Sequence, residues 1–115
     1  MNSALKIILI LAVVGILASR LQSNSGAGAK ICPEIAARTE EVIRSGEIIG
    51  VVVESSADRL LVEDSRWTQA PHNFKVSLAL AQFCINFPKG AGTLLVRGYR
   101  DGVLKASVID GNYSD

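Results

Sequence analysis

The sequence predicts an α+β domain preceded by an N-terminal hydrophobic helix. Three observations support this prediction: an unbroken apolar run near the N-terminus, two segments with apolar residues at helical spacing, and two pairs of β-branched segments around short polar turns. The order is helix, hairpin, helix, hairpin. A two-layer sandwich with an antiparallel four-stranded sheet is the simplest arrangement that buries the apolar faces of both helices. The 115 residues suffice for one such domain and one extra segment.

The N-terminal run covers residues 7–18, reads IILILAVVGILA and lies between Lys6 and Arg20. It fits the apolar core of a secretory signal peptide, with residues 1–6 as the charged region before it. It also fits an uncleaved anchor that enters the membrane through residues 4–19, although a spanning helix usually has about 20 apolar residues. We expect residues 1–20 to be an anchor and keep the cleaved signal peptide as the alternative.

The short N-terminal tail predicts that the domain lies on the exported side of the membrane, periplasmic or extracellular. Secretion after signal cleavage is the alternative location. Residues 21–31 are rich in Ser, Gly and Asn and have no apolar period, which predicts a flexible tether. Residues 32–115 then form the small α+β domain.

The first half of this domain is expected to contain a helix over residues 33–45 and a hairpin over residues 48–64. Pro33 suits the first position of a helix, and Gly46 suits the position just after its end. In the hairpin, residues 56 and 57 as the turn would pair Glu54 with Arg59, Val53 with Leu60 and Val51 with Val62.

The second half is expected to contain a buried helix over residues 71–87 and a hairpin over residues 93–109. On the helix, Phe74, Leu78, Ala81 and Ile85 recur at helical spacing, and the polar residues form one narrow stripe. Asp101 and Gly102 form a preferred two-residue turn. That turn pairs Tyr99 with Leu104, Arg97 with Ala106 and Leu95 with Val108, and it leaves residues 110–115 as a polar tail.

The order helix, hairpin, helix, strand is similar to that of the BON domains of bacterial envelope proteins. Those domains carry a glycine in the strand that leads to their second helix, whereas residues 60–67 of this chain, LLVEDSRW, contain none. The resemblance is therefore one of element order.

Composition and motifs exclude several classes of function. With 12 basic and 11 acidic residues the chain is not a strongly basic nucleic-acid-binding protein. One histidine and two cysteines are too few for a typical metal centre. The segment from Gly90 to Leu95 lacks the third glycine of a dinucleotide-binding motif. We therefore expect no cofactor, no metal and no nucleic acid, and we assign no catalytic residue.

Cys32 and Cys84 lie 52 positions apart and do not form a C-x-x-C motif. In an exported domain they would form a structural disulfide. Alternatively, Cys84 is an inert thiol in the core of the buried helix.

A candidate interaction surface combines Trp67 with the basic residues Lys89, Arg97, Arg100 and Lys105 in and around the second hairpin. Acidic residues gather on the first hairpin instead, which predicts a mild polarity across the sheet. Ordinary solubilising charge explains the same pattern, and Trp67 would equally cap a small core.

These observations predict a non-enzymatic accessory or binding module, membrane-anchored or exported, whose partner is another protein. One alternative is a small subunit of a membrane protein complex. The other is a small envelope enzyme that uses Cys32 or His72.

Overall fold

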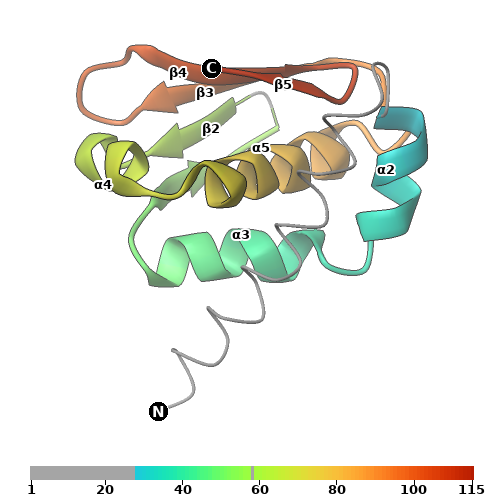
Figure 1. The fold of residues 1–115 in the computed structure, drawn as a ribbon, viewed down its shortest axis with the longest axis horizontal. Helices are drawn as coiled ribbons and strands as arrows, with labels where there is room; N and C mark the ends of the chain where they lie inside the picture. The colour runs from blue at the N-terminus through green and yellow to red at the C-terminus, as the bar shows by residue number, and fades with distance from the viewer. Residues whose placement is uncertain (1–27, 58) are drawn as a thin grey trace.

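The computed structural model describes residues 28–57 and 59–115, which form four helices and five strands (Figure 1). The α+β class is confirmed. The predicted anchor, residues 1–20, lies outside the described residues, as does most of the predicted tether. Among the helices that the structure describes, none has the length and apolar character needed to cross a membrane. In chain order the elements are α2 (Gly28–Ile35), α3 (Thr39–Ile48), β1 (Val52–Ser55), β2 (Arg59–Val62), α4 (Asp64–Gln69), α5 (His72–Asn86), β3 (Thr93–Gly98), β4 (Leu104–Ile109) and β5 (Asn112–Ser114).

The sheet is mixed and has the strand order β1-β2-β3-β4-β5. Strands β2 and β3 are parallel, and the other three pairs are antiparallel. The prediction of an antiparallel four-stranded sheet is therefore wrong. The chain leaves β2 at one end of the sheet, passes through α4 and α5, and enters β3 at the opposite end, where β2 also began, so the two strands are parallel.

The fifth strand comes from the segment predicted as a polar tail. Asp110 and Gly111 have φ angles of 52° and 90°, and they join β4 to β5 as a two-residue turn that pairs Ile109 with Asn112. Positive φ at both central residues is the geometry that makes Asp-Gly a preferred hairpin turn.

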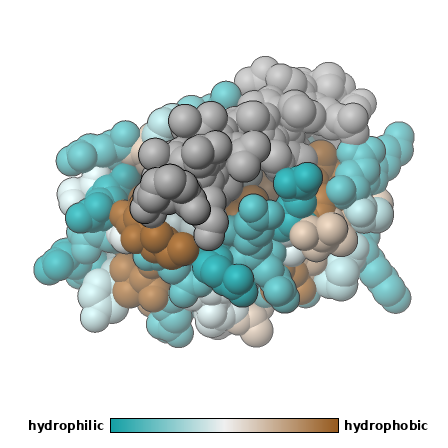
Figure 2. Space-filling model, turned by 90° about the horizontal axis from the view of Figure 1, so that it is seen from below, coloured by the Kyte–Doolittle hydropathy of each residue, from teal (hydrophilic) through white to brown (hydrophobic). Residues whose placement is uncertain are grey.

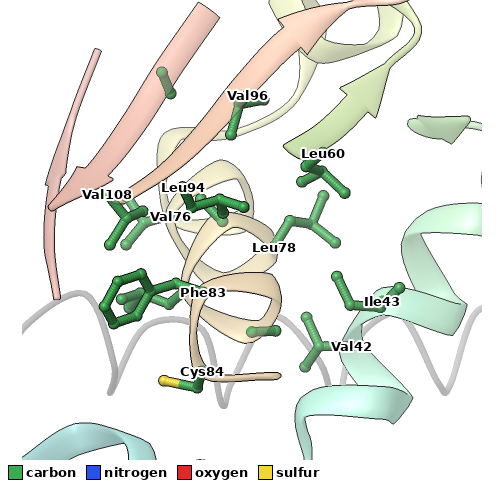
Figure 3. Packing of buried hydrophobic residues seen from close by; sticks show 14 of the residues in the cluster. Val42, Ile43, Leu60, Val76, Leu78, Phe83, Cys84, Leu94, Val96 and Val108 are labelled. Atoms are coloured by element: carbon green, nitrogen blue, oxygen red, sulfur yellow. The ribbon is translucent and has the colours of Figure 1, made fainter. Parts of the chain in front are cut away.

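Helices α3 and α5 cover one face of the sheet, and none of the described helices lies over the other face, which we call the open face (Figure 1). Buried side chains of α5 and α3 point toward those of the sheet in the core (Figure 3). Gly46 permits the close approach of α3, because a Cβ atom at this position would lie 2.7 Å from side-chain atoms of both Leu78 and Val52. The core residues labelled in Figure 3 are Val42 and Ile43 of α3, Val76, Leu78, Phe83 and Cys84 of α5, and Leu60, Leu94, Val96 and Val108 of the sheet.

The single helix predicted over residues 33–45 is two helices in the structure. A turn over residues 36–38 separates α2 from α3, Pro33 lies inside α2, and the amide of Arg38 donates to the carbonyl of Ile35. The break changes the direction of the chain, so the apolar side chains of both helices reach the core. Helix α2 also includes residues 28–31 of the predicted tether.

Both predicted hairpin registers are wrong. In the first hairpin the observed pairs are Val52 with Val62 and Ser55 with Leu60, and an irregularity lies between residues 52 and 54. In the second, Val96 pairs with Ala106. A loop longer than two residues joins β3 and β4, which shifts the register by one position. In β3 the shift turns Leu94 and Val96 to the core in place of Leu95 and Arg97, whereas Ala106 and Val108 of β4 stay on the core side.

The buried helix predicted over residues 71–87 is observed as α5, over His72–Asn86. Leu78 is fully buried, as predicted, whereas Ile85 has 42% of its surface exposed. Gln82, predicted to lie on the polar stripe, is buried. Its side-chain amide donates to the carbonyl of Ser56 at 3.2 Å and to Oδ1 of Asn86 at 3.0 Å, so this polar group ties α5 to the connection between β1 and β2.

Candidate functional site: the open face of the sheet

The open face of the sheet has leucine side chains on both sides of a central arginine. Arg97 of β3 pairs with Leu61 of β2 and with Leu104 of β4. Paired residues of neighbouring strands point to the same face, and successive residues of a strand alternate between faces. Val96, the neighbour of Arg97, is fully buried beneath the helices. Arg97 and its two leucine partners therefore lie on the face that none of the described helices covers.

A second row on the same face runs beside the first. Leu95 pairs with Arg59 of β2 and with Ser107 of β4. Leu61 and Leu95 are partly exposed, whereas Leu104 is exposed. Across the middle three strands the open face thus places leucines beside Arg59 and Arg97, with Ser107 at the β4 end of the second row.

The exposed apolar residues gather at the sheet. Five of the seven large apolar residues that are exposed in the described part of the chain belong to its strands or to the β3–β4 loop, residues 99–103. From the opposite side, Figure 2 shows polar residues over most of the coloured surface, with smaller groups of apolar residues between them. A concentration of exposed apolar side chains is typical of an interaction site. The five residues are Val53, Tyr99, Val103, Leu104 and Ile109.

The β3–β4 loop is fixed to the strand and helix beside it. The amide of Tyr99 donates to the carbonyl of Val62 at 2.7 Å, and the amide of Asp101 donates to Oδ2 of Asp64 at 3.1 Å. Gly98 permits this approach, because a Cβ atom there would overlap the carboxylate of Asp64. The glycine at the end of β3 therefore lets the start of α4 hold the loop.

Hydrogen bonds inside the loop fix it further. The amide of Val103 donates to Oδ1 of Asp101 at 2.8 Å, and Nη1 of Arg97 donates to the carbonyl of Gly102 at 3.2 Å. The apolar side chains of Tyr99 and Val103 are thus exposed on a backbone that is already ordered. Such a loop loses little conformational entropy when it binds a partner.

Two ion pairs neutralise the basic residues at this end of the sheet. Nε of Arg100 lies 3.2 Å from Oε2 of Glu63, and Nζ of Lys105 lies 2.8 Å from Oδ2 of Asp101. The hydrogen bond from Arg100 holds the pKa of Glu63 below its usual value. The hydrogen bond between Lys105 and Asp101 lowers the pKa of the acid and raises the pKa of the amine.

The predicted separation of charge across the sheet is absent at this end because β2 and β3 are parallel. Parallel pairing brings the acidic residues that follow β2, Glu63 and Asp64, to the same end as the basic residues that follow β3. Glu63 therefore neutralises Arg100 there, and Asp64 accepts a hydrogen bond from the backbone of the β3–β4 loop.

The five residues of the predicted interaction surface do not form one surface. Trp67 lies in α4 with only 3% of its surface exposed, and Nζ of Lys75 lies 5.8 Å from its ring centre. Lys89 is exposed in the connection before β3, at the opposite end of that strand from Arg100. The structure brings together Arg97, Arg100 and Lys105, and it places Trp67 in the core.

Sequence reasoning missed the aliphatic part of the open face. Leu61, Leu95 and Leu104 lie on the open face of three neighbouring strands, but the assumed two-residue turn assigned Leu95 and Leu104 to the core. The row that faces the core instead includes Leu94 and Val96. Both rows of β3 are apolar enough to face a core, so the turn length decided the assignment.

Cys32 of α2 and Cys84 of α5 are joined by a disulfide bond in the structure, with an S–S distance of 2.06 Å. Both side chains are buried. In the described part of the chain no cysteine carries a free thiol. This bond attaches the first described helix to the helix at the centre of the core.

His72, at the start of α5, lies beside the last strand. Its Nδ1 atom is 3.7 Å from Oδ2 of Asp115, and the hydroxyl of Tyr113 donates to the same oxygen at 3.3 Å. Partial burial raises the pKa of the Tyr113 hydroxyl. More than half of the His72 side chain is exposed. The described residues contain no group of three histidine, cysteine or acidic side chains arranged to hold a metal ion.

No family model, curated protein or solved structure matches the chain. The proposals that follow therefore depend on the geometry of the open face.

Proposed function

We propose that this protein is a non-enzymatic binding module, held at a membrane or exported by its N-terminal segment, whose open sheet face binds another protein. The observation that supports it most directly is the gathering of exposed apolar side chains on this face and on the ordered loop at its end. Burial of this exposed aliphatic surface against a partner would contribute favourable free energy to binding.

The residue types on this face also suit a protein partner. Tyr99 and Arg100 lie next to each other at the end of the sheet, both exposed. Tyrosine and arginine are enriched among the residues that contribute most of the binding energy at protein interfaces. The ordered β3–β4 loop holds both residues in place before a partner arrives.

Two features support the proposed location. The apolar run over residues 7–18 has the character of an anchor or signal peptide, and the Cys32–Cys84 disulfide is typical of proteins in oxidising compartments. Helix α2, where the described chain begins, and the β3–β4 loop lie at opposite ends of the longest axis (Figure 1).

The experiment compares a photo-crosslinking residue placed at four positions of the full chain in its native host. Positions 104 and 109 lie on the open face, and positions 48 and 85 are exposed apolar positions on helices. We expect the two sheet positions to give one adduct of the same protein and the two helix positions to give none. Equal adducts from all four positions, or none from any, would contradict the proposal.

The alternative of a small subunit of a membrane complex predicts a different dependence on the N-terminal segment. Deletion of residues 1–20 would then remove the adduct formed at position 104. If the open face binds the partner by itself, the protein that lacks residues 1–20 gives the same adduct when it is placed in the compartment that contains the partner.

The enzyme alternative now rests on His72, because Cys32 has no free thiol in the structure. His72 has a carboxylate at 3.7 Å in Asp115, which is the orienting group that a general base needs. The hydroxyl of Tyr113 donates to the same carboxylate, but its raised pKa makes it a poor nucleophile, and the arrangement supplies no activated one. We therefore favour the binding module.

A further inference from the structure

We infer that the partner presents a carboxylate, set among apolar side chains, to Arg97 at the centre of the open face. This inference rests on the proposed function and names the chemistry of the partner at the same site. Arg97 differs from the other basic residues of its hairpin in its surroundings and in its contacts.

Arg100 and Lys105 each have an acidic partner, Glu63 and Asp101 respectively. Arg97 has no carboxylate within salt-bridge distance among residues 28–57 and 59–115. Its hydrogen bond to the carbonyl of Gly102 uses Nη1 and leaves other N–H groups of the guanidinium available to a ligand. The sheet therefore holds a fixed positive charge that the described part of the chain does not neutralise.

The surroundings of Arg97 determine what would bind it well. Leu61 and Leu104 lie on either side of it in the neighbouring strands. Apolar contacts around an ion pair exclude water, and a charge-assisted hydrogen bond then contributes more to affinity. The planar guanidinium matches the two oxygens of a carboxylate. An aspartate or glutamate flanked by apolar residues therefore complements Arg97 and its two leucine neighbours.

An anionic membrane surface fits this face less well than a protein does. Glu54 pairs with Leu61 on the same face, and Asp110 follows Ile109 at its end, so the face carries acidic as well as basic groups. Anionic lipids are concentrated on the cytoplasmic leaflet, whereas we propose that the domain is exported. A protein that presents a single carboxylate to Arg97 avoids both the repulsion from the acidic groups and the mismatch of compartment.

The test uses the full chain in native membranes, with the photo-crosslinking residue at position 104. The yield of the protein adduct is compared between the unmodified background, Arg97→Gln, Arg97→Lys and Arg44→Gln. Arg44 is exposed on α3, away from the open face, and is the matched control for loss of one charge. We expect Arg97→Gln to reduce the yield at least tenfold, Arg97→Lys to reduce it less, and Arg44→Gln to leave it unchanged.

A second arm separates binding from folding. Mass spectrometry of the adduct identifies the partner and its acidic residue nearest to the cross-link. Charge reversal by Arg97→Glu should abolish the adduct, and an arginine in place of that acidic residue in the partner should restore it. A change in the partner cannot repair a folding defect in this chain, so restoration supports a direct contact.

The two proposals fail in different ways. An adduct that depends on position but changes less than twofold with Arg97→Gln overturns the role of Arg97 and leaves the binding module intact. An adduct with lipid alone overturns the protein partner. The absence of any difference between sheet and helix positions overturns the proposed function itself.

Discussion

Leu78→Ala and Ile85→Ala make the same kind of truncation on the same helix at two levels of burial. The periodicity of α5 places both residues on one apolar face, but the structure buries Leu78 completely and leaves Ile85 with 42% of its surface exposed. Leu78 also contacts the region of Gly46, where α3 crosses α5. The pair therefore tests whether the observed packing, and not the sequence pattern, determines stability.

The expected magnitudes follow from burial. Removing a fully buried leucine side chain loses its transfer free energy and leaves a cavity, and such changes cost about 3–5 kcal/mol of unfolding free energy. Ile85→Ala removes three carbon atoms from a side chain that is a little more than half buried. At about 0.8 kcal/mol per buried methylene group this costs about 1.4 kcal/mol, without a cavity.

The assay is thermal unfolding of residues 21–115, followed by circular dichroism, with urea unfolding as a second measurement. For a domain of this size about 1 kcal/mol corresponds to about 4–8 °C in the melting temperature. We expect Leu78→Ala to melt about 6 °C or more below Ile85→Ala. Equal melting temperatures for the two variants would refute the packing of α5 between the sheet and α3.

Three further predictions concern contacts that hold the domain together. Replacing Cys32 and Cys84 by alanine should lower the unfolding free energy by about 4 kcal/mol, because the disulfide closes a long loop in the unfolded chain. A strong reductant should lower the melting temperature of the unmodified chain to that of this variant. Gly98→Ala should lower the melting temperature because its Cβ atom would overlap the Asp64 carboxylate, whereas Gly102→Asn, at φ 67° with no atom near, should change it little, and the reverse order would be inconsistent with the loop described. The lowered pKa of Asp101 means that its ion pair with Lys105 stabilises the domain above about pH 4 and that this stabilisation is lost as pH falls through the native pKa. The melting temperatures of the unmodified chain and of Lys105→Gln should therefore converge below about pH 4. A constant difference between them from pH 3 to pH 6 would contradict this.

The sequence alone was sufficient for the elements whose local pattern has one solution. Helix α5 is long and strongly apolar, and its predicted bounds differ from the observed ones by one residue at each end. The existence of strands before and after Asp101 followed from β-branched residues around a turn. The segment Asp110–Gly111 carried the same turn pattern, and applying the rule there would have predicted β5.

Tertiary contacts decided the features that local pattern leaves ambiguous. The residues around 36–38 have no strong helix-breaking residue, and the chain turns there because both α2 and α3 bury apolar residues. The parallel pairing of β2 with β3 is a contact between strands distant in sequence, and no local pattern specifies it.

The candidate site shows the same division between sequence and structure. Arg97, Arg100 and Lys105 were selected from the sequence as charged residues near one hairpin, but their roles depend on which strand lies beside β3. Parallel pairing supplies Glu63 to Arg100, and the β3–β4 loop supplies Asp101 to Lys105, whereas Arg97 is left between leucines. Side-chain type was set by the sequence; the neutralisation or exposure of each charge was set by the sheet, because ion pairs form between groups that only the fold brings together.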